Sequence, residues 1–481
     1  MDDVNRRSNG GVKARSQKLN ITVFSGDGQL STAPGTAANS LVDVFNRIIE
    51  RKNRELHYVI PISDNGGSSS ELIRFVGGPS VGDIRSRLVR LIPNCEGDEE
   101  MKALKVLFEH RLNSDAAKAR EEWSEIVEGR NLLWGFISSP KRELIRSFLN
   151  TLNLELVKRV RPGSVFNFAN ASIGNMFLTG ARIFSGSFES AIYLLSIVCA
   201  MPSSVNVLPA INSNHTHHIS AGLADGTQIT GQVMISHPSA PTALPDETLV
   251  APALTAEDHD RIEDASLPGS LPVLRRQHIT FSKQDEEELP ARIQRLWYIN
   301  QYGHEIWPVA NPKVLDALQA SSVIVYCIGS LYTSIVPSLV LRGVGERIAV
   351  TATTPCHKIL LLNSRLDRET GPVGTDPMTA RDFVVAIARA AAESWTLPEA
   401  LRRQGGLDAL LSTYVSHLVY PAGLDEARTS GAPHVDVAEL QRLGVVCVKV
   451  AARTVLLQDK TPMLRYDEGA LGEALEAIID S

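Results

Sequence analysis

A short apolar segment, 57–62 (HYVIPI), ends abruptly in a loop of Gly, Ser, Asn and one acid, 63–70 (SDNGGSSS). A helical pattern opens soon afterwards at 82–85 (GDIR). A strand that stops in Gly and Ser leaves backbone N–H groups facing a crevice, where they can bind a phosphate at close approach. The loop therefore predicts phosphate or nucleotide binding. A tight surface turn is the alternative, and a flexible linker is disfavoured because ordered apolar patterns flank the loop.

The start of the chain reads as strand, loop, helix and strand. Leu19 to Phe24 is partly β-branched, Asn39 to Arg51 repeats apolar residues at helical spacing, and 57–62 is the second strand. This order with a short crossover predicts a parallel sheet in a right-handed α/β unit. The stretch 26–28 (GDG) is half of a dinucleotide fingerprint, but no third Gly follows at the required place, so a true fingerprint is disfavoured.

Composition narrows the class of protein. The 481 residues are 43% hydrophobic, which allows a sizeable core and about two or three domains. The net charge of -6 gives no basic excess for nucleic acid or an anionic membrane, and no apolar run is clean enough to span a bilayer. The 5 Cys are scattered without metal spacing, so we expect a reducing compartment, no disulfide framework and a cytoplasmic location.

Two more stretches place small polar residues before a helix. In 166–175 (FNFANASIGN), compact polar donors lie beside a Gly, a composition that suits either an anion contact or plain helix capping by Ser172. After the apolar strand Ser322 to Cys327, the turn 329–334 (GSLYTS) opens another helix. Turns of this kind line the carboxyl edge of an open α/β sheet, so 329–334 is predicted to face the 63–70 loop across a cleft, unless it is a simple strand-to-helix turn.

A β-hairpin is predicted where Asp225-Gly226 separates two apolar runs, Ile219 to Leu223 and Gln228 to Ile235. His215 and His217 would share one face of a strand. No Cys or acid nearby completes a ligand set, so we prefer surface or hydrogen-bonding histidines to a metal site.

The domain prediction is a disordered arm at 1–18, an α/β domain at 19–365 and a helical or α/β extension at 366–481 that packs on the core. The α/β domain would carry a helical insertion at about 100–160 and a mobile insertion, rich in Pro, Ala and acids, at about 239–276. Arg347 to Thr351 is a further strand candidate.

Five of these stretches resemble one family, the 2-phospho-L-lactate transferase and gluconeogenesis-factor-like proteins of the CofD-like superfamily, in its eukaryotic type. They are 63–69 (SDNGGSS), 82–85 (GDIR), 171–175 (ASIGN), 225–227 (DGT) and 329–334 (GSLYTS). One such motif would be weak evidence, whereas five in the family's order, spread over roughly residues 20 to 365, are specific.

The resemblance implies a Rossmann-like three-layer α/β core with a mostly parallel sheet and a site for a nucleotide-linked ligand. The family's transferase branch moves a phospholactyl group from a guanosine diphosphate carrier to a deazaflavin hydroxyl with Mg²⁺, and its regulatory branch binds nucleotide sugars such as uridine diphosphate sugars. We expect a phospholactyl-type transferase acting on a nucleotide-diphosphate-linked donor. The alternatives are a non-catalytic nucleotide-sugar-binding regulator of carbon metabolism and a catalytically dead scaffold. A homo-oligomer is left open.

Roles for individual residues follow from the same resemblance. Asp64 would bind Mg²⁺ or accept the acceptor's proton, with Asp83 as the second catalytic carboxylate. The expected phosphate and ligand contacts are Gly26, Thr36, Asn65, Gly66, Gly67, Ser68, Arg85, Asn170, Ser172, Asn175, Gly329, Ser330 and Thr333. The chain departs from the family in two places. Residues 27–34 split the family's Gly-Gly-Thr turn, and Asn65 replaces an acid of many relatives, which would weaken a shared metal site.

Overall fold

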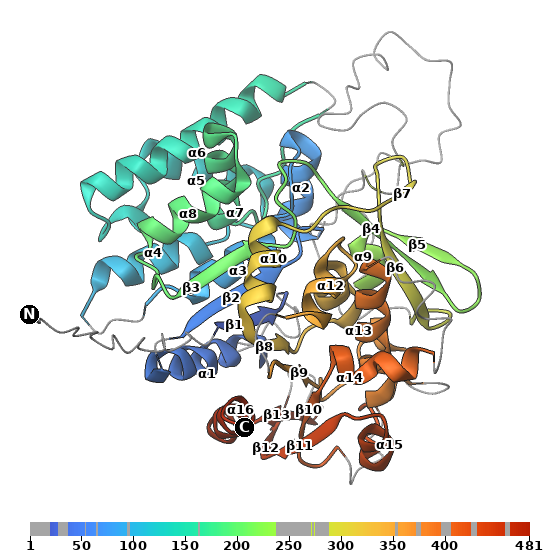
Figure 1. Cartoon of the computed structure of the whole chain (residues 1–481). Coiled ribbons are helices and arrows are strands. Elements are labelled where there is room, and N and C mark those ends of the chain that lie inside the picture. Colours follow the sequence, from blue (N-terminus) through green and yellow to red (C-terminus); the bar gives the residue numbers. More distant parts are fainter. Residues whose placement is uncertain are drawn as a thin grey trace, which may run out of the picture.

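The computed structural model describes residues 20–26, 37–52, 54–63, 66–93, 97–161, 164–236, 271, 274, 288–351, 355–371, 377–395, 406–424, 431–456 and 462–481. The predicted arm at 1–18 and the predicted insertion at 239–276 lie outside these residues, apart from 271 and 274. The described chain forms a three-layer α/β structure with a helical lobe on one side (Figure 1).

A central sheet of seven strands in the order β11-β10-β9-β8-β1-β2-β3 forms the middle layer, and every neighbouring pair is parallel. The strands are β1 (Asn20–Phe24), β2 (Glu55–Ile60), β3 (Val205–Pro209), β8 (Ser321–Tyr326), β9 (His357–Leu361), β10 (His417–Pro421) and β11 (Val446–Val450). The prediction of a Rossmann-like core with a parallel sheet is confirmed. The chain builds the sheet outward from β1 in both directions, so the order reverses between β1 and β8.

Alternation along the strands directs side chains to two helical layers. Val23 and Tyr58 are register partners, and the Tyr58 ring packs edge-on against Phe45 of α1 (Ala37–Lys52) at 6.5 Å. On the opposite face Phe24 stacks on Tyr326 at 5.7 Å. The Tyr326 hydroxyl donates to the carbonyl of the last residue of α14 (Leu411–Tyr414) at 2.8 Å. The sheet is therefore buried on both faces, as a parallel sheet requires.

Further elements complete the two layers. They are α2 (Gly67–Val76), α3 (Gly82–Arg90), α9 (Gln232–Ser236), α10 (Pro312–Ala320), η4 (Leu331–Ile335), α11 (Val336–Leu339), α12 (Val344–Ala349), η5 (Arg368–Thr370), α13 (Ala380–Ser394), η7 (Leu407–Leu410), α15 (Val437–Arg442) and α16 (Glu468–Ile479). The C-terminal α16 lies against α1, where Arg51 pairs with Glu476 at 3.1 Å.

The helical lobe consists of α4 (Glu99–Glu109), α5 (Ala116–Glu128), η1 (Leu132–Trp134), α6 (Ser139–Arg159), α7 (Ile173–Ser185) and α8 (Phe188–Val198). Asp98 and Asp115 cap α4 and α5 through their carboxylates. Phe177 of α7 packs edge-on against Phe108 and Phe148, at 5.1 and 5.4 Å, and so joins α4, α6 and α7. This lobe covers the β3 side of the sheet (Figure 1).

A four-stranded antiparallel sheet, β5-β4-β6-β7, lies beside the core, and a two-stranded sheet pairs β12 (Ala452–Leu456) with β13 (Pro462–Tyr466). The larger sheet contains β4 (His218–Leu223), β5 (Gln228–Thr230), β6 (Ile293–Ile299) and β7 (Glu305–Ile306). The predicted hairpin is confirmed: β4 and β5 pair across Gly226, whose φ of 87° suits glycine, while the Asp225 carboxylate accepts the Thr227 N–H at 2.9 Å.

Two local predictions are wrong. The hairpin strand expected to run to Ile235 ends at Thr230, and α9 follows it. The strand expected at Arg347 to Thr351 overlaps α12, because a short apolar run cannot distinguish a buried helix from a strand. Gly345 lets α12 approach α13 closely: a Cβ built there would lie 1.7 Å from the carbonyl oxygen of Ala391.

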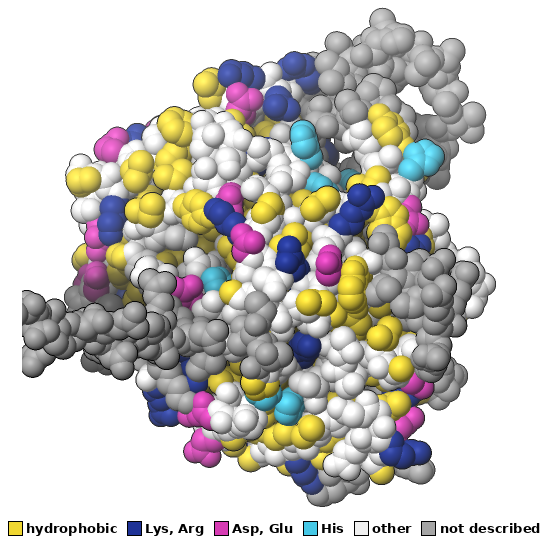
Figure 2. Space-filling model, viewed as in Figure 1, with side chains coloured by type: hydrophobic (Ala, Val, Ile, Leu, Met, Phe, Trp, Pro, Cys, Tyr) yellow, Lys and Arg dark blue, Asp and Glu magenta, His cyan; other side chains and the backbone are white. Residues whose placement is uncertain are grey.

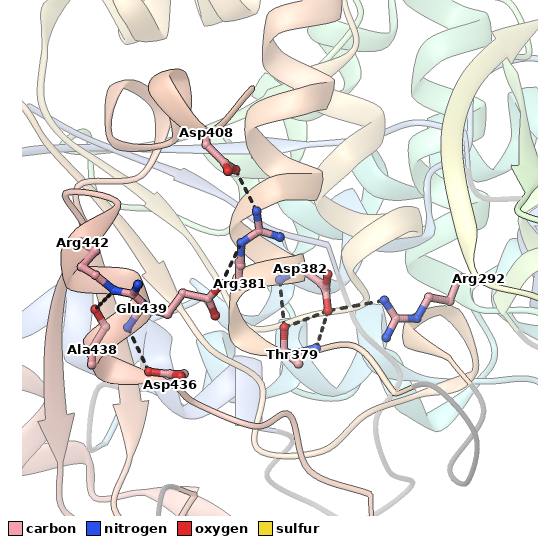
Figure 3. A network of polar contacts seen from close by, with 9 residues as sticks. All are labelled: Arg292, Thr379, Arg381, Asp382, Asp408, Asp436, Ala438, Glu439 and Arg442. Carbon is pink, nitrogen blue, oxygen red and sulfur yellow. Dashed lines mark hydrogen bonds and ion pairs between the residues drawn. The ribbon is translucent and has the colours of Figure 1, made fainter. Parts of the chain in front are cut away.

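A polar network joins the start of α13 to its neighbours (Figure 3). Thr379 and Asp382 form a capping box, and Asp382 also pairs with Arg292 at 3.4 Å. Arg381, the residue before Asp382 on the helix, pairs with Asp408 at 2.8 Å and with Glu439 of α15. The network fixes α13, which packs against α11 and α12 behind the β8 turn.

The face of the molecule shown in Figure 2 carries Lys and Arg side chains interspersed with Asp and Glu. Among the described residues, no helix is both long and apolar enough to cross a membrane.

Candidate functional site

The carboxyl edge of the sheet, where the strand order reverses, brings together three of the predicted turns. Gly26 lies two residues beyond β1, Ser63 lies three residues beyond β2, and Gly329 lies three residues beyond β8. Open α/β sheets bind ligands at this position because the turns on the two sides diverge and leave a crevice. The site is therefore built from loops and helix starts that the sheet holds in register.

The first part of the site joins the beginnings of α2 and α7. The N-cap of α2 is Gly66, which has no side chain to cover the backbone N–H groups behind it. The hydroxyl oxygen of Ser68, in the first turn, accepts the Ser172 N–H at 3.4 Å and the Asn175 amide at 3.0 Å. Ser172 is the N-cap of α7, yet its buried hydroxyl makes no hydrogen bond within the described part of the chain. The positive ends of the α2 and α7 dipoles thus meet beside the Ser172 hydroxyl, an orphan in the sense that it has no hydrogen-bond partner among the described residues.

Arg85 brings a third helix start, that of α3, to the same place. Its Nε donates to the Asn175 side-chain oxygen at 3.2 Å. A Cβ on Gly174 would lie 2.7 Å from the Arg85 side chain and 2.6 Å from the Phe108 carbonyl oxygen. Only glycine at position 174 therefore leaves room for the Arg85 side chain to pass. Four predicted contacts, Ser68, Arg85, Ser172 and Asn175, therefore form one cluster that combines helix dipoles with a cation, as an anion site requires.

Gly26, Asp83 and Ser334 form the second part of the site, at the end of β1. A Cβ on Gly26 would lie 2.5 Å from Ser334 Oγ and 3.2 Å from an Asp83 carboxylate oxygen. Glycine is thus needed at position 26 for close approach, and Asp83 stands at the mouth of the β1 turn. Mg²⁺ that bridges phosphates typically takes one or two protein carboxylates, so Asp83 is suited to be such a ligand.

The β8 turn differs from expectation, because an internal carboxylate occupies it. Glu369 of η5 is fully buried and accepts the N–H groups of Tyr332 and Thr333 at 2.9 and 3.1 Å. The Thr333 hydroxyl also donates to Glu369. Burial raises the pKa of Glu369 to about 8, and the nearby Asp367 charge adds to the rise. The Thr333 donors that were predicted to hold ligand are therefore engaged with Glu369.

The other residues of the β8 turn are tied to the core. Gly329 exchanges two hydrogen bonds with the Asn363 side chain, at 2.8 and 3.4 Å. Ser330 is the N-cap of η4 and makes no side-chain cap bond.

Asn170, predicted as a contact, sits in the turn before α7 with a left-handed φ of 57°, and its backbone oxygen accepts from Arg111 at 3.3 Å.

A buried arginine under the β1 and β2 ends adds positive charge. Arg87 of α3 is 5% exposed, stacks on the Tyr58 ring at 4.5 Å, and donates to the Ser25 hydroxyl at 3.4 Å. No described carboxylate pairs with it, and its Nε has no hydrogen-bond partner among the described residues. A buried cation without a carboxylate is costly, and an anion in the neighbouring crevice would offset that cost.

Three predicted site residues, Thr36, Asp64 and Asn65, lie outside the described residues, as does the 27–34 segment. The catalytic and metal roles of Asp64 and the second catalytic role of Asp83 stay predictions. No group of three or more His, Cys, Asp or Glu that could hold a metal occurs within the described ranges. The His217 ring nitrogen hydrogen-bonds the His215 carbonyl at 3.0 Å.

Sequence reasoning did not identify Glu369, whereas Ser334 was expected to face the 63–70 loop with the rest of the 329–334 turn. Ser334 belongs to the 329–334 motif, but only the packing shows that it, rather than Thr333, faces Gly26. Glu369 had no local signal, because its partners lie 36 and 37 residues earlier.

Known proteins resemble this chain in sequence and in fold. The sequence matches the family described as 2-phospho-L-lactate transferase CofD over residues 32–452. It is 43% identical over 370 residues to Uncharacterized protein YNL011C of Saccharomyces cerevisiae, which covers 73% of this chain and 79% of the yeast protein. Two crystal structures of protein BH3568 from Bacillus halodurans, one described as a UPF0052 family member, match with a TM-score of 0.54 at 20% identity, over 95% of this chain and 99% of the bacterial one. At that identity the likeness bears on the fold alone.

Proposed function

The chain belongs to the CofD family, and we propose that it is a phospholactyl-type transferase that acts on a nucleotide-diphosphate-linked donor. The observation that carries the proposal is the meeting of the α2, α3 and α7 starts at Ser68, Arg85 and Asn175. Backbone donors and a cation gathered at one point suit the phosphates of a nucleotide better than any neutral ligand. The position at the strand-order reversal is where Rossmann-like sheets bind nucleotides.

Group transfer from a diphosphate depends on alignment and charge neutralisation more than on covalent help from the protein. In this proposal Gly66, Gly67 and Ser68 donate to the phosphates, while Arg85 and the α7 start offset their charge. Mg²⁺, when bound, would neutralise the charge of the diphosphate, with Asp64 and Asp83 as its carboxylate ligands. Transfer would break the P–O–P bond of the donor, pass the phospholactyl group to the acceptor hydroxyl and release a nucleoside monophosphate. Asp64 would alternatively accept the proton of the acceptor hydroxyl.

A second function is favoured by the β8 turn. Because Glu369 already fills the donors at the start of η4, this turn is less suited to hold a phosphate. A site in which the donors of one turn are already occupied by an internal side chain would suit a regulator that binds a nucleotide sugar without turnover. Both proposals use the same α2 and α7 anion cluster, and they differ in whether product forms.

Calorimetry with guanosine diphosphate and with a uridine diphosphate sugar, each with Mg²⁺, tests whether the cluster binds nucleotides. Asn175→Ala removes bonds to Ser68 and Arg85 and is expected to weaken binding roughly 10- to 100-fold, since a hydrogen bond to a charged group contributes about 1.5–3 kcal/mol. The matched control is Asn153→Ala, because Asn153 also loses a side-chain bond, to Trp123 at 2.9 Å, but lies on α6 away from the cluster.

Mass spectrometry of molecules that copurify with the protein, followed by product analysis with the identified donor, separates the two functions. New product that depends on Mg²⁺ and disappears in Asp64→Asn supports the transferase. Tight binding without product supports the regulator. If neither nucleotide binds, or if Asn175→Ala binds as well as the control, the proposal is wrong.

A further inference from the structure

A group of uncharged polar side chains lies on the β2 side of the site, under the sheet β5-β4-β6-β7. Tyr298 of β6 is 1% exposed, and its hydroxyl makes no hydrogen bond of good geometry among the described residues. The Ser63 hydroxyl lies beside it as a weak hydrogen-bonding neighbour, which lowers the Tyr298 pKa against the larger rise that burial causes. Ser63 in turn donates to the Gln232 side-chain oxygen at 3.3 Å. These three side chains come from β6, the β2 loop and the start of α9.

Ser80 adds a second orphan hydroxyl at the same strand end. Its backbone N–H donates to the Ile62 carbonyl at 3.1 Å, which holds the 77–80 loop beside the end of β2. Its own hydroxyl is buried and has no partner within the described part of the chain. Native proteins rarely leave buried hydroxyls unpaired, and those that exist are usually bonded to a ligand or an ordered water. The Ser80 hydroxyl and the weakly bonded Tyr298 hydroxyl thus belong to segments that meet near the end of β2, and both have capacity for a further hydrogen bond.

The group is neutral, unlike the anion cluster. Its members are two serines, a glutamine and a tyrosine, and burial raises the pKa of Tyr298, so the hydroxyl remains a donor at neutral pH. His217 packs its ring edge-on against Tyr298 at 6.2 Å, and burial lowers the pKa of His217, which keeps it uncharged. The group contains no cation to neutralise a phosphate, and its hydroxyl and amide donors and acceptors suit a hydroxyl, carbonyl or amide of a ligand.

The two sites are neighbours along the chain. Only residues 64 and 65 separate Ser63 from Gly66, so their Cα atoms lie at most about 11 Å apart. A nucleotide-linked molecule is long enough to reach from one to the other. One ligand can thus place its diphosphate at Ser68 and Asn175 and an uncharged part beside Ser63 and Tyr298.

We propose that Ser63, Ser80, Gln232 and Tyr298 form a second subsite, which hydrogen-bonds an uncharged part of the nucleotide-linked ligand and so determines specificity. This inference rests on the proposed function, because it assumes that the α2 and α7 cluster holds the phosphates. Tyr298 is the specificity determinant with the sharpest test, since phenylalanine removes one hydroxyl and leaves the ring packing in place.

The test compares inorganic pyrophosphate, guanosine diphosphate and a uridine diphosphate sugar by calorimetry on the full chain, with and without Tyr298→Phe. Tyr298→Phe is expected to weaken the binding of at least one nucleotide-linked probe roughly three- to tenfold, while pyrophosphate binding stays unchanged. Tyr466→Phe is the matched control, because its buried hydroxyl donates to the Leu362 and Val419 carbonyls at 2.8 and 2.9 Å away from this group. It should lower the melting temperature without changing affinity.

Stability gives an independent readout. Removal of an orphan hydroxyl should leave the melting temperature of Tyr298→Phe equal or higher, in contrast to Tyr466→Phe. A lower melting temperature would show that Tyr298 has a partner inside the protein and would overturn the inference. Unchanged affinity for both nucleotide-linked probes, with pyrophosphate still bound, would overturn it as well. Failure of every probe to bind the unaltered protein would instead refute the proposed function, and the inference with it.

Discussion

Glu369 offers the sharpest test of how the β8 turn is held. Its buried carboxyl binds the first N–H groups of η4, and burial raises its pKa to about 8 from an ordinary value of 4.5. The folded protein therefore favours the protonated acid, whereas the unfolded chain releases the proton near 4.5. This contribution to stability is fully present below about pH 4.5 and is lost as the pH rises through 8.

The size of the effect follows from the two pKa values. The difference between about 8 and 4.5, at about 1.4 kcal/mol per pH unit, corresponds to roughly 5 kcal/mol across the whole range. About 3 kcal/mol of this is already lost at pH 7. Glu369→Gln cannot ionise, and its amide oxygen can still accept the Tyr332 and Thr333 N–H groups. The variant should therefore match the parent near pH 5 and exceed its stability by several kcal/mol near pH 9.

Urea denaturation followed by circular dichroism, repeated between about pH 5 and pH 9, measures this difference. Glu346→Gln is the control, because Glu346 is exposed on α12 and its loss should leave the pH dependence of the free energy of unfolding as it is. Equal pH slopes for the parent and Glu369→Gln would refute the reasoning. They would mean that Glu369 is ionised in the folded protein and fully stabilised by its three donors.

Three further changes test the packing. Gly345→Ala should lower the free energy of unfolding by more than about 3 kcal/mol, since the added Cβ would meet the α13 backbone at 1.7 Å, and urea denaturation checks this. Thr379→Ala should cost about 1 kcal/mol through loss of the α13 capping box with Asp382, as thermal melting would show. Gly26→Ala should weaken guanosine diphosphate binding roughly tenfold or more in calorimetry, because it displaces Ser334 at the β1 turn, and equal affinity would contradict that role.

The sequence could predict the features that depend on local patterns. β1, β2 and the Asp225-Gly226 hairpin each carry their signal within a few residues, so the structure places them close to expectation. The anion cluster could also be predicted from the sequence, because Ser68 and Asn175 each lie in a polar turn just before or within the first turn of a helix. Parallel strands in order then force such turns to one edge.

The remaining features come from contacts between distant parts of the chain. Tyr298 reaches Ser63 across more than 200 residues of sequence, and Glu369 reaches η4 from the segment after β9. Neither residue differs locally from an ordinary apolar strand or a polar turn. The choice between helix and strand at α12 was likewise decided by packing against α13, which only glycine at 345 permits. Propensity gives way to tertiary contact in such cases.

Glu369 also explains why similar Gly and Ser turns need not have the same role. The α2 and α7 starts carry no internal acid in their first turns, and their side chains bond one another through Ser68 and Asn175. The η4 start has its own buried carboxyl. An added phosphate would thus meet helix dipoles at α2 and α7 without a carboxyl side chain in their first turns, but would compete with a bound acid at η4. Negative charge should therefore collect on the β2 side of β1, which leaves the β8 turn to position Ser334 against Gly26 rather than to bind the anion itself.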